Sequence, residues 1–312
     1  MFPIIPAGAA ASYPTNDEGI FGFGGGCPSS SMTNLVSNTG VVSSDVAGVG
    51  TGRENLGACE FGGDQGIFMG GWSSISPSGN RGTSNIVSNT GVVATDVAAV
   101  TSIPRYGLAG CEYGEDKGIF FGGYGGTPAV LVGITNLVSN SGVVQSDTAA
   151  VGGVTARQYI AMCEYGGDKG IIGFGAAPSR VSTTNLISNS GVVQSDTAGV
   201  VGVTVRLKPA ACGYGGDKGI FGYGSAATEY VSISNLVNNT GVVGTDVTGV
   251  GSARDGLAAC EYGDDKGIFG FGDTTGTTNV GMTNLVTNAG VVGDDVSAVG
   301  TARKTLAACS FN

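Results

Sequence analysis

Histidine is absent from this sequence of 312 residues, and its absence limits the chemistry that the chain can perform. Histidine is the commonest general base and metal ligand, and it activates the nucleophile in Ser-His and Cys-His arrangements. An enzyme built from this chain would have to use carboxylates, tyrosines or cysteines, and no unrepeated cluster of these residues stands out. We therefore predict a protein that is not an enzyme, with a carboxylate-based enzyme as the least favoured function.

Cysteine is the residue type whose spacing most invites a chemical interpretation. Six of the seven cysteines occupy one position of a repeated frame: Cys59, Cys111, Cys163, Cys212, Cys260 and Cys309. A ring of thiolates would bind a soft metal, but the Cys-x-x-Cys spacing of metal sites is absent, so small buried hydrophobic residues are the favoured interpretation. Equivalent positions on neighbouring repeats should lie beyond the roughly 7 Å between Cα atoms that a disulfide allows. We expect unbridged thiols, no metal and no cofactor. Cys27 lies outside the frame and has no obvious partner.

One aspartate and one arginine also recur in every repeat. The aspartates are Asp45, Asp96, Asp147, Asp196, Asp246 and Asp295, and the arginines are Arg53, Arg105, Arg157, Arg206, Arg254 and Arg303. Such a set could line a binding rim, but we favour ion pairs between repeats or capped turns, the commoner roles of such residues. The Gly-Asp-Lys turns, such as that at Asp116 and Lys117, lack the closely spaced oxygens of a calcium loop, so we expect solvated hairpins.

The elements that must position these residues follow a sixfold repeat. The pentapeptide Asn-(Thr/Ser/Ala)-Gly-Val-Val begins at Asn38, Asn89, Asn140, Asn189, Asn239 and Asn288. Each repeat contains about four short strand-like runs separated by turn residues, and sustained helical periodicity is nearly absent. Four antiparallel strands recurring about every 50 residues are typical of the blades of a β-propeller.

We therefore predict an all-β fold, a six-bladed β-propeller with four antiparallel strands per blade. Residues 16–312 form this single domain, and residues 1–15 form an N-terminal arm. The last residues, Leu306–Phe311, have the pattern of a first strand, and Gly19–Gly24 have that of a second strand. Pairing these two segments would close the ring and cover both strand edges. Tandem β-trefoils are the alternative fold.

The segment RYGLAGCEYGEDKGIFFGG, from Arg105 to Gly123, resembles the kelch class of propellers, in which an arginine precedes a small-residue strand and a strand ending in Gly-Gly. The resemblance implies blade topology across residues 16–312. Kelch blades usually carry a Tyr and a Trp in their later strands, whereas this chain has the single tryptophan Trp72, so the resemblance does not extend to kelch partners. The repeats are also similar to tandem repeats in uncharacterised proteins of marine phages and aquatic microbes.

Composition limits the classes of partner. The net charge of −10 and the scattered 14 basic residues argue against nucleic acid. No apolar stretch is long enough to span a membrane. The N-terminal segment has no basic residues and contains early prolines, so we recognise no signal peptide.

The link between the second and third strand-like runs varies from repeat to repeat. Loops on a rigid scaffold often carry function, and aromatic and arginine side chains are favoured interface anchors. The candidate binding residues there are Trp72, Arg81, Tyr124, Arg180, Glu229 and Tyr230. Neutral drift in loops without a role is the competing interpretation.

The N-terminal arm is apolar for its length, and its prolines favour extended backbone. Its candidate attachment residues are Phe2, Ile4, Ile5 and Tyr13. A frayed terminus without a role is the alternative.

We expect a structural or adhesion protein of a virion or another extracellular assembly, whose protein partners bind the arm or the variable loops. The alternative is a soluble lectin that binds glycans.

Overall fold

The computed structural model describes residues 17–26, 28–98, 101–150, 152–199, 201–297 and 299–311. Within these ranges the chain is all-β, contains no helix, and forms many small antiparallel sheets. It follows that no helix among the described residues could cross a membrane. The predicted attachment residues Phe2, Ile4, Ile5 and Tyr13, together with Cys27, lie outside the described residues.

Six main sheets repeat one pattern of inner, middle and third strand. The inner strands are β3 (Gly57–Phe61), β9 (Ala109–Tyr113), β15 (Ala161–Tyr165), β18 (Ala210–Tyr214), β21 (Ala258–Tyr262) and β24 (Ala307–Phe311). The middle strands are β4 (Gln65–Met69), β10 (Lys117–Phe121), β16 (Lys169–Gly173), β19 (Lys218–Gly222), β22 (Lys266–Gly270) and β1 (Glu18–Gly22). The third strands are β7 (Ser84–Val87), β13 (Ile134–Val138), β17 (Thr184–Ile187), β20 (Ser234–Val237), β23 (Thr283–Val286) and β2 (Thr33–Val36).

The fourth predicted run of each repeat is a regular strand in only one of these sheets. The sheet of β9, β10 and β13 gains β14 (Thr148–Ala149), whereas the other five have three strands. Elsewhere the run is held by isolated bridges, such as those from Val36 to Val42 and from Thr33 to Val46. Between these bridges the side-chain amide of Asn34 donates to the carbonyl oxygen of Ser43 at 3.0 Å. The prediction of four regular strands is therefore corrected, in five of the six sheets, to three strands and a bridged segment, because the fourth run meets the third strand at only two separate positions.

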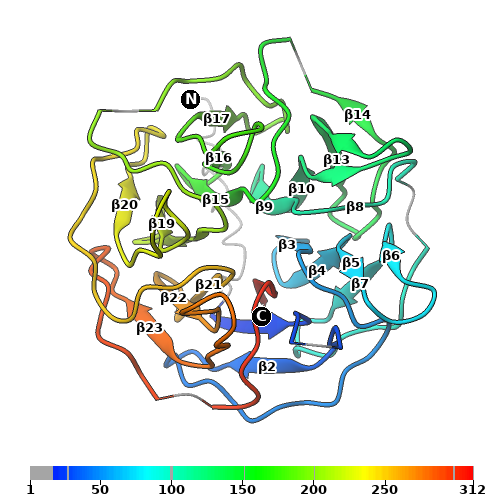
Figure 1. The fold of residues 1–312 in the computed structure, drawn as a ribbon, viewed down its shortest axis with the longest axis horizontal. Helices are drawn as coiled ribbons and strands as arrows, with labels where there is room; N and C mark the ends of the chain where they lie inside the picture. The colour runs from blue at the N-terminus through cyan, green and yellow to red at the C-terminus, as the bar shows by residue number, and fades with distance from the viewer. Residues whose placement is uncertain are drawn as a thin grey trace, which may run out of the picture.

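The sheets are arranged around a central axis (Figure 1). Each inner strand contacts the inner strands of two neighbouring sheets, and these contacts form a cycle through β3, β9, β15, β18, β21 and β24. The strand β24 pairs antiparallel with β1, from Glu18 opposite Phe311 to Gly22 opposite Ala307. The predicted pairing of the last residues with the first strand is thus confirmed.

A cycle of six backbone hydrogen bonds joins the sheets where the inner strands begin. In each bond an amide N–H donates to the carbonyl oxygen of the equivalent residue in the neighbouring sheet, with N to O distances of 2.5–3.3 Å. All six residues have a left-handed φ, between 49° and 71°. They are Asn55, Gly107, Tyr159, Lys208, Gly256 and Thr305. Because every unit donates to one neighbour and accepts from the other, each sheet is fixed from both sides.

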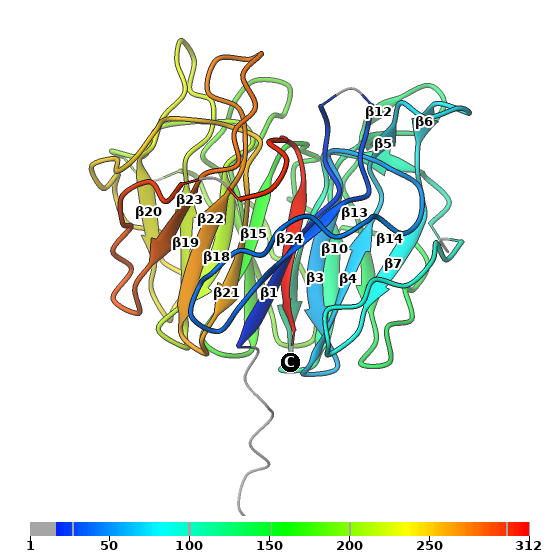
Figure 2. The same ribbon diagram turned by 90° about the horizontal axis from the view of Figure 1, so that it is seen from below.

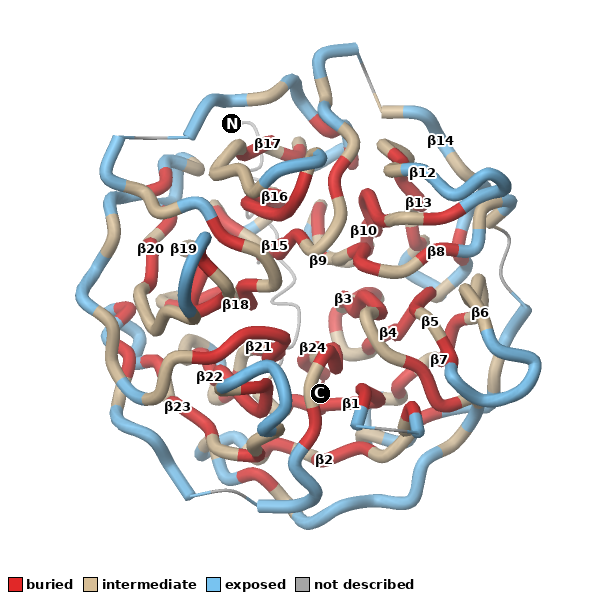
Figure 3. The backbone as a smooth tube through the Cα atoms, in the orientation of Figure 1, coloured by how far each residue is buried: buried red, intermediate tan, exposed pale blue. Residues whose placement is uncertain are grey.

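The recurring cysteines are small residues fitted between neighbouring sheets. All six are free and buried, and Figure 3 shows that burial is concentrated inside the molecule. The Sγ atom of Cys59 lies where the neighbouring sheet has Gly118, and a Cβ added there would be 2.4 Å from it. The same pairing of a cysteine with a glycine recurs at Cys111 with Gly170 and in the remaining repeats. The close packing of neighbouring sheets therefore depends on a cysteine in one sheet and a glycine at the facing position of the next.

The recurring arginines are buried network residues and do not line a binding rim. Each is at most 2% exposed. Arg206 donates from Nη2 to Oδ1 of Asn235 at 2.6 Å, and its Nη1 lies 3.9 Å from Oδ1 of Asp246. Asp246 in turn accepts from the backbone amide and the hydroxyl of Thr204. The predicted ion pairs and turn caps are present, but acid and base lie within one sheet and not between sheets. The contact with the neighbouring sheet is the guanidinium of Arg206 over the ring of Phe174, 4.1 Å from its centroid.

Candidate functional site

The links between the middle and third strands lie at one end of the molecule, opposite the carboxyl end of β24 (Figure 2). These links carry the six side chains that the sequence analysis selected as candidate binding residues. The structure brings three of them into one pocket and leaves the other three outside it.

Arg180, Glu229 and Tyr230 line a pocket of about 440 Å³, which we call the loop pocket. This volume is within the range of small-molecule sites. The pocket lies between links of three successive sheets. Its other lining residues are Ser225, Ala226, Ala227, Thr228, Ala253, Thr274 and Thr275.

A short hairpin forms one wall of the loop pocket. Ser225 and Tyr230 are bridged antiparallel, and the amide of Ala226 donates to the carbonyl oxygen of Glu229 at 2.8 Å. Between them the chain turns through exposed small and polar residues. The turn leaves Glu229 exposed and Tyr230 half-buried beside the cavity.

Arg180 ties the opposite wall to this hairpin. Its Nε donates to the carbonyl oxygen of Ser225 at 3.0 Å, and its Nη2 donates to the hydroxyl oxygen of Ser225 at 3.2 Å. Arg180 comes from the link of one sheet and Ser225 from the link of the next. Because the guanidinium has five donors in a fixed plane, two bonds to Ser225 orient the group and leave donors for a ligand.

Two buried acids lie beside the loop pocket. Asp255 and Asp273 are 8% and 0% exposed, and Oδ2 of Asp273 pairs with Nζ of Lys304 at 3.0 Å. Burial raises the pKa of Tyr230, and the nearby charges of Asp255 and Asp273 raise it further. Tyr230 is therefore a neutral phenol near neutral pH, able both to donate and to accept a hydrogen bond.

The loop pocket thus combines an aromatic ring, a guanidinium, a carboxylate and several hydroxyl groups. Its lining supplies both donors and acceptors, which suits ligand groups that also do both. Arg180 can donate, Glu229 can accept, and the threonine hydroxyls can do either.

The remaining three predicted residues serve local structure. Trp72 begins the short strand β5 (Trp72–Ser73), which pairs with β6 (Gly79–Asn80). Arg81 donates from Nη2 to the carbonyl oxygens of Ile75 and Pro77 in its own link. Tyr124, in β11 (Tyr124–Gly125), has its ring 5.8 Å from that of Tyr106. Tyr106 belongs to β8 (Arg105–Tyr106), and β12 (Val130–Leu131) completes that small sheet.

Sequence reasoning missed a second cavity, on the central axis. It is lined by residues of the inner strands, among them the six cysteines and Glu60, Glu112, Glu164 and Glu261. The available signal was the Cys-Glu pair, which occurs in four of the six repeats. Gly213 and Ser310 stand in its place in the other two.

No protein-family model matches the sequence, and no curated protein matches it. Solved structures do match: 214 chains resemble this one in three dimensions. One of them, described as "Structure of YjhT", superposes with a TM-score of 0.65 at 12% sequence identity. The match covers 82% of this chain and 88% of that chain. The likeness is one of fold. It leaves the function to be argued from the residues of the two cavities.

Proposed function

We propose that the chain is a six-bladed β-propeller that acts as a non-enzymatic binding protein with a carbohydrate ligand in the loop pocket. The propeller interpretation is supported by the cycle of contacts among the inner strands and by the cycle of six backbone hydrogen bonds. Both are expected when blades pack side by side around an axis. The pairing of β24 with β1 supplies the closing blade with strands from both ends of the sequence.

The observation that carries the carbohydrate assignment is the convergence of Arg180, Glu229 and Tyr230 on one pocket of about 440 Å³. A sugar presents hydroxyl groups, which donate and accept, together with an apolar ring face. The mixed polar walls match the hydroxyl groups, and the ring of Tyr230 offers an aromatic surface with a polar tip.

A glycan array probed with the full-length chain tests this proposal. We expect binding to a restricted set of glycans, followed by measurable affinity for the best of them in calorimetry. Tyr230→Ala and Arg180→Ala should each weaken that affinity by about tenfold or more, because they remove contacts inside the pocket. Arg81→Ala is the matched control, because Arg81 lies on a link outside the pocket. An array without a bound glycan, or full affinity in Tyr230→Ala, would refute the assignment.

A structural role in a virion or another extracellular assembly is the second candidate, and one feature favours it. The first valine after the Asn-x-Gly turn is 47–64% exposed in all six repeats. These residues, which follow the third strands, are Val41, Val92, Val143, Val192, Val242 and Val291. Apolar positions repeated on a surface often mark contacts with other proteins. Replacing all six valines with threonine should prevent co-purification with the native particle, and unaltered co-purification would refute this role.

A further inference from the structure

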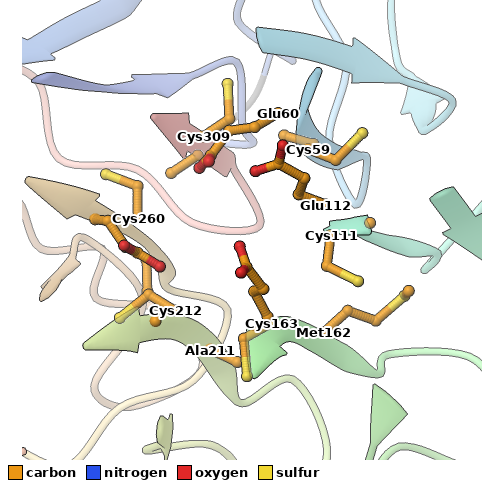
Figure 4. Close-up of a pocket in the computed structure, with 17 residues that line it drawn as sticks. Cys59, Glu60, Cys111, Glu112, Met162, Cys163, Ala211, Cys212, Cys260 and Cys309 are labelled. Carbon is orange, nitrogen blue, oxygen red and sulfur yellow. The ribbon is translucent and has the colours of Figure 1, made fainter. Parts of the chain in front are cut away.

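The cavity on the central axis carries a group of acids that the proposed function does not use. We call it the axial cavity, and its volume is about 50 Å³. Since about 10–15 Å³ is enough for one water molecule, the cavity has room for several. Figure 4 shows Glu60 and Glu112 directed toward the space between the inner strands. The cysteine Sγ atoms instead pack against glycines of the neighbouring sheets.

Four inner strands each contribute one glutamate to the axial cavity. Glu60 is on β3, Glu112 on β9, Glu164 on β15 and Glu261 on β21. The two remaining inner strands have Gly213 and Ser310 at the equivalent position. No lysine or arginine is among the described residues that line the cavity.

The two exceptional positions supply backbone donors. Oε1 of Glu60 accepts from the amide of Ser310 at 2.9 Å. The carboxylate of Glu261 has a backbone hydrogen bond with Gly213. A Cβ at residue 213 would lie 1.7 Å from Oε1 of Glu261, so the carboxylate in this position occupies the space that a side chain at residue 213 would fill.

One carboxylate oxygen of Glu112 lacks a backbone donor of this kind. Its Oε1 atom is shielded from solvent and has no hydrogen-bond partner. A buried carboxylate oxygen without a donor is costly, because it has lost water and gained nothing in its place. Burial, followed by the charges of the neighbouring glutamates, raises the pKa of Glu112 and of Glu261, and raises that of Glu164 to about 8. The cluster is thus short of positive charge and of donors.

A proton or a cation can supply that charge, and the geometry limits which cation. Among the described residues no three His, Cys, Asp or Glu side chains are placed to ligate one metal ion together. An ion in the axial cavity must therefore keep water molecules between itself and most of the carboxylates. Mg²⁺ behaves in this way, because it gives up its water reluctantly and often uses only one or two carboxylates.

We propose that the axial cavity is a site for a hard divalent cation of the magnesium class, which the axial glutamates hold through its water shell. Bound water would donate to the unpartnered oxygen of Glu112, and the ion would offset the charge of all four glutamates. Protons compete with the ion for the same carboxylates. The titratable groups around the cavity are the four glutamates, whose carboxyl groups face it, and the acids Glu115, Asp116, Asp168 and Asp265 on nearby turns. The inner strands also carry the thiols of Cys59, Cys111, Cys163, Cys212, Cys260 and Cys309, which pack between the sheets.

Thermal unfolding of the full chain in MgCl₂ and in NaCl of equal ionic strength tests the site. At pH 9 we expect MgCl₂ to raise Tm by about 3 °C or more. Equal Tm values in the two salts at pH 9 would overturn the proposal.

Variants locate the effect. Glu112→Gln and Glu164→Gln each remove one charge from the axial cavity and should abolish the Tm difference between the two salts. Glu115→Gln removes one charge from an exposed turn nearby and should keep the difference. Calorimetric titration of the folded wild-type chain with MgCl₂ should give saturable binding that Glu112→Gln lacks. Binding that survives in both axial variants would place the ion elsewhere and overturn the proposal.

Discussion

Two arginines illustrate the difference between the repeated framework and the variable links. Arg206 has five equivalents, is fully buried, and bonds to Asn235 beside Asp246 in its own sheet. Arg180 occurs in one link only, is partly exposed, and bonds to Ser225 of the next sheet's link. The framework uses its arginines for folding, and the links are free to use theirs for a ligand. The comparison shows that the chemistry of a residue type in this protein depends on whether the residue recurs.

The largest expected effect comes from breaking one framework network. Arg206→Ala should lower the free energy of unfolding by about 3 kcal/mol, because it leaves Asn235 and Asp246 without their buried partner. Arg180→Ala should change it by less than about 1 kcal/mol, since partly exposed contacts contribute little. Denaturant titration of both variants measures the contrast. Similar losses in the two would show that the links also support the fold.

An intermediate effect is expected from the contact between cysteine and glycine across neighbouring sheets. Gly118→Ala should cost roughly 1–3 kcal/mol, because its Cβ would lie 2.4 Å from Sγ of Cys59. Cys59→Ala in the same chain should recover part of this loss, since it removes the clashing sulfur. A double-mutant cycle with denaturant titration measures the coupling. Strictly additive losses would mean that this contact does not determine the frame.

The smallest expected effect is on the pH dependence of stability, to which two kinds of acid in the repeated sheets contribute with opposite sign. Burial raises the pKa of Asp96 and of Asp196, but hydrogen bonds from a threonine and an asparagine outweigh it and leave both pKa values lowered. Their contribution to stability is present above their ordinary pKa of 3.8 and is lost as the pH falls. Glu164 behaves in the opposite sense. Its pKa rises from 4.5 to about 8 on folding, so its contribution is complete below pH 4.5 and is lost as the pH rises through 8.

Stability in EDTA should therefore fall between pH 5 and pH 8. Glu164→Gln should reduce that fall by roughly 2 kcal/mol, after allowance for screening by water in the cavity on the central axis. Denaturant titrations across this pH range measure it, and Glu229→Gln on the exposed hairpin should leave the profile unchanged. A wild-type profile that is flat from pH 5 to pH 8 would contradict the assignment of a raised pKa to Glu112, Glu164 and Glu261.

Much of the framework of repeated sheets could be predicted from the sequence, because the regular spacing of the repeated motifs is sufficient to indicate it. The recurrence of one pentapeptide and of Gly-rich runs was enough to predict the repeated antiparallel sheets. The strand patterns of Leu306–Phe311 and Gly19–Gly24 were enough to predict the pairing of β24 with β1. The bridged fourth segment was not predictable, because the strand-like pattern Gly-Val-Val does not reveal that the run meets its third strand at only two positions, as Val42 does with Val36 and Val46 with Thr33.

The sites could be predicted only in part. Arg180, Glu229 and Tyr230 were recognised as unusual side chains, but their convergence depends on how far the links of neighbouring sheets lean toward each other. The axial glutamates were overlooked because two of the six repeats lack them. Their proximity follows from the packing of inner strands around the axis, which no local pattern reveals.

The cycle of hydrogen bonds through Asn55, Gly107 and their equivalents has a consequence for how the molecule comes apart. An open row of repeats has two terminal units, and it can fray from either of them. A cycle has none. Detaching any one sheet breaks two of the six bonds at once and exposes the flanks of both neighbours. Local opening is therefore as costly in one sheet as in the next, and the amides of this cycle should be protected from hydrogen exchange until the whole fold is lost.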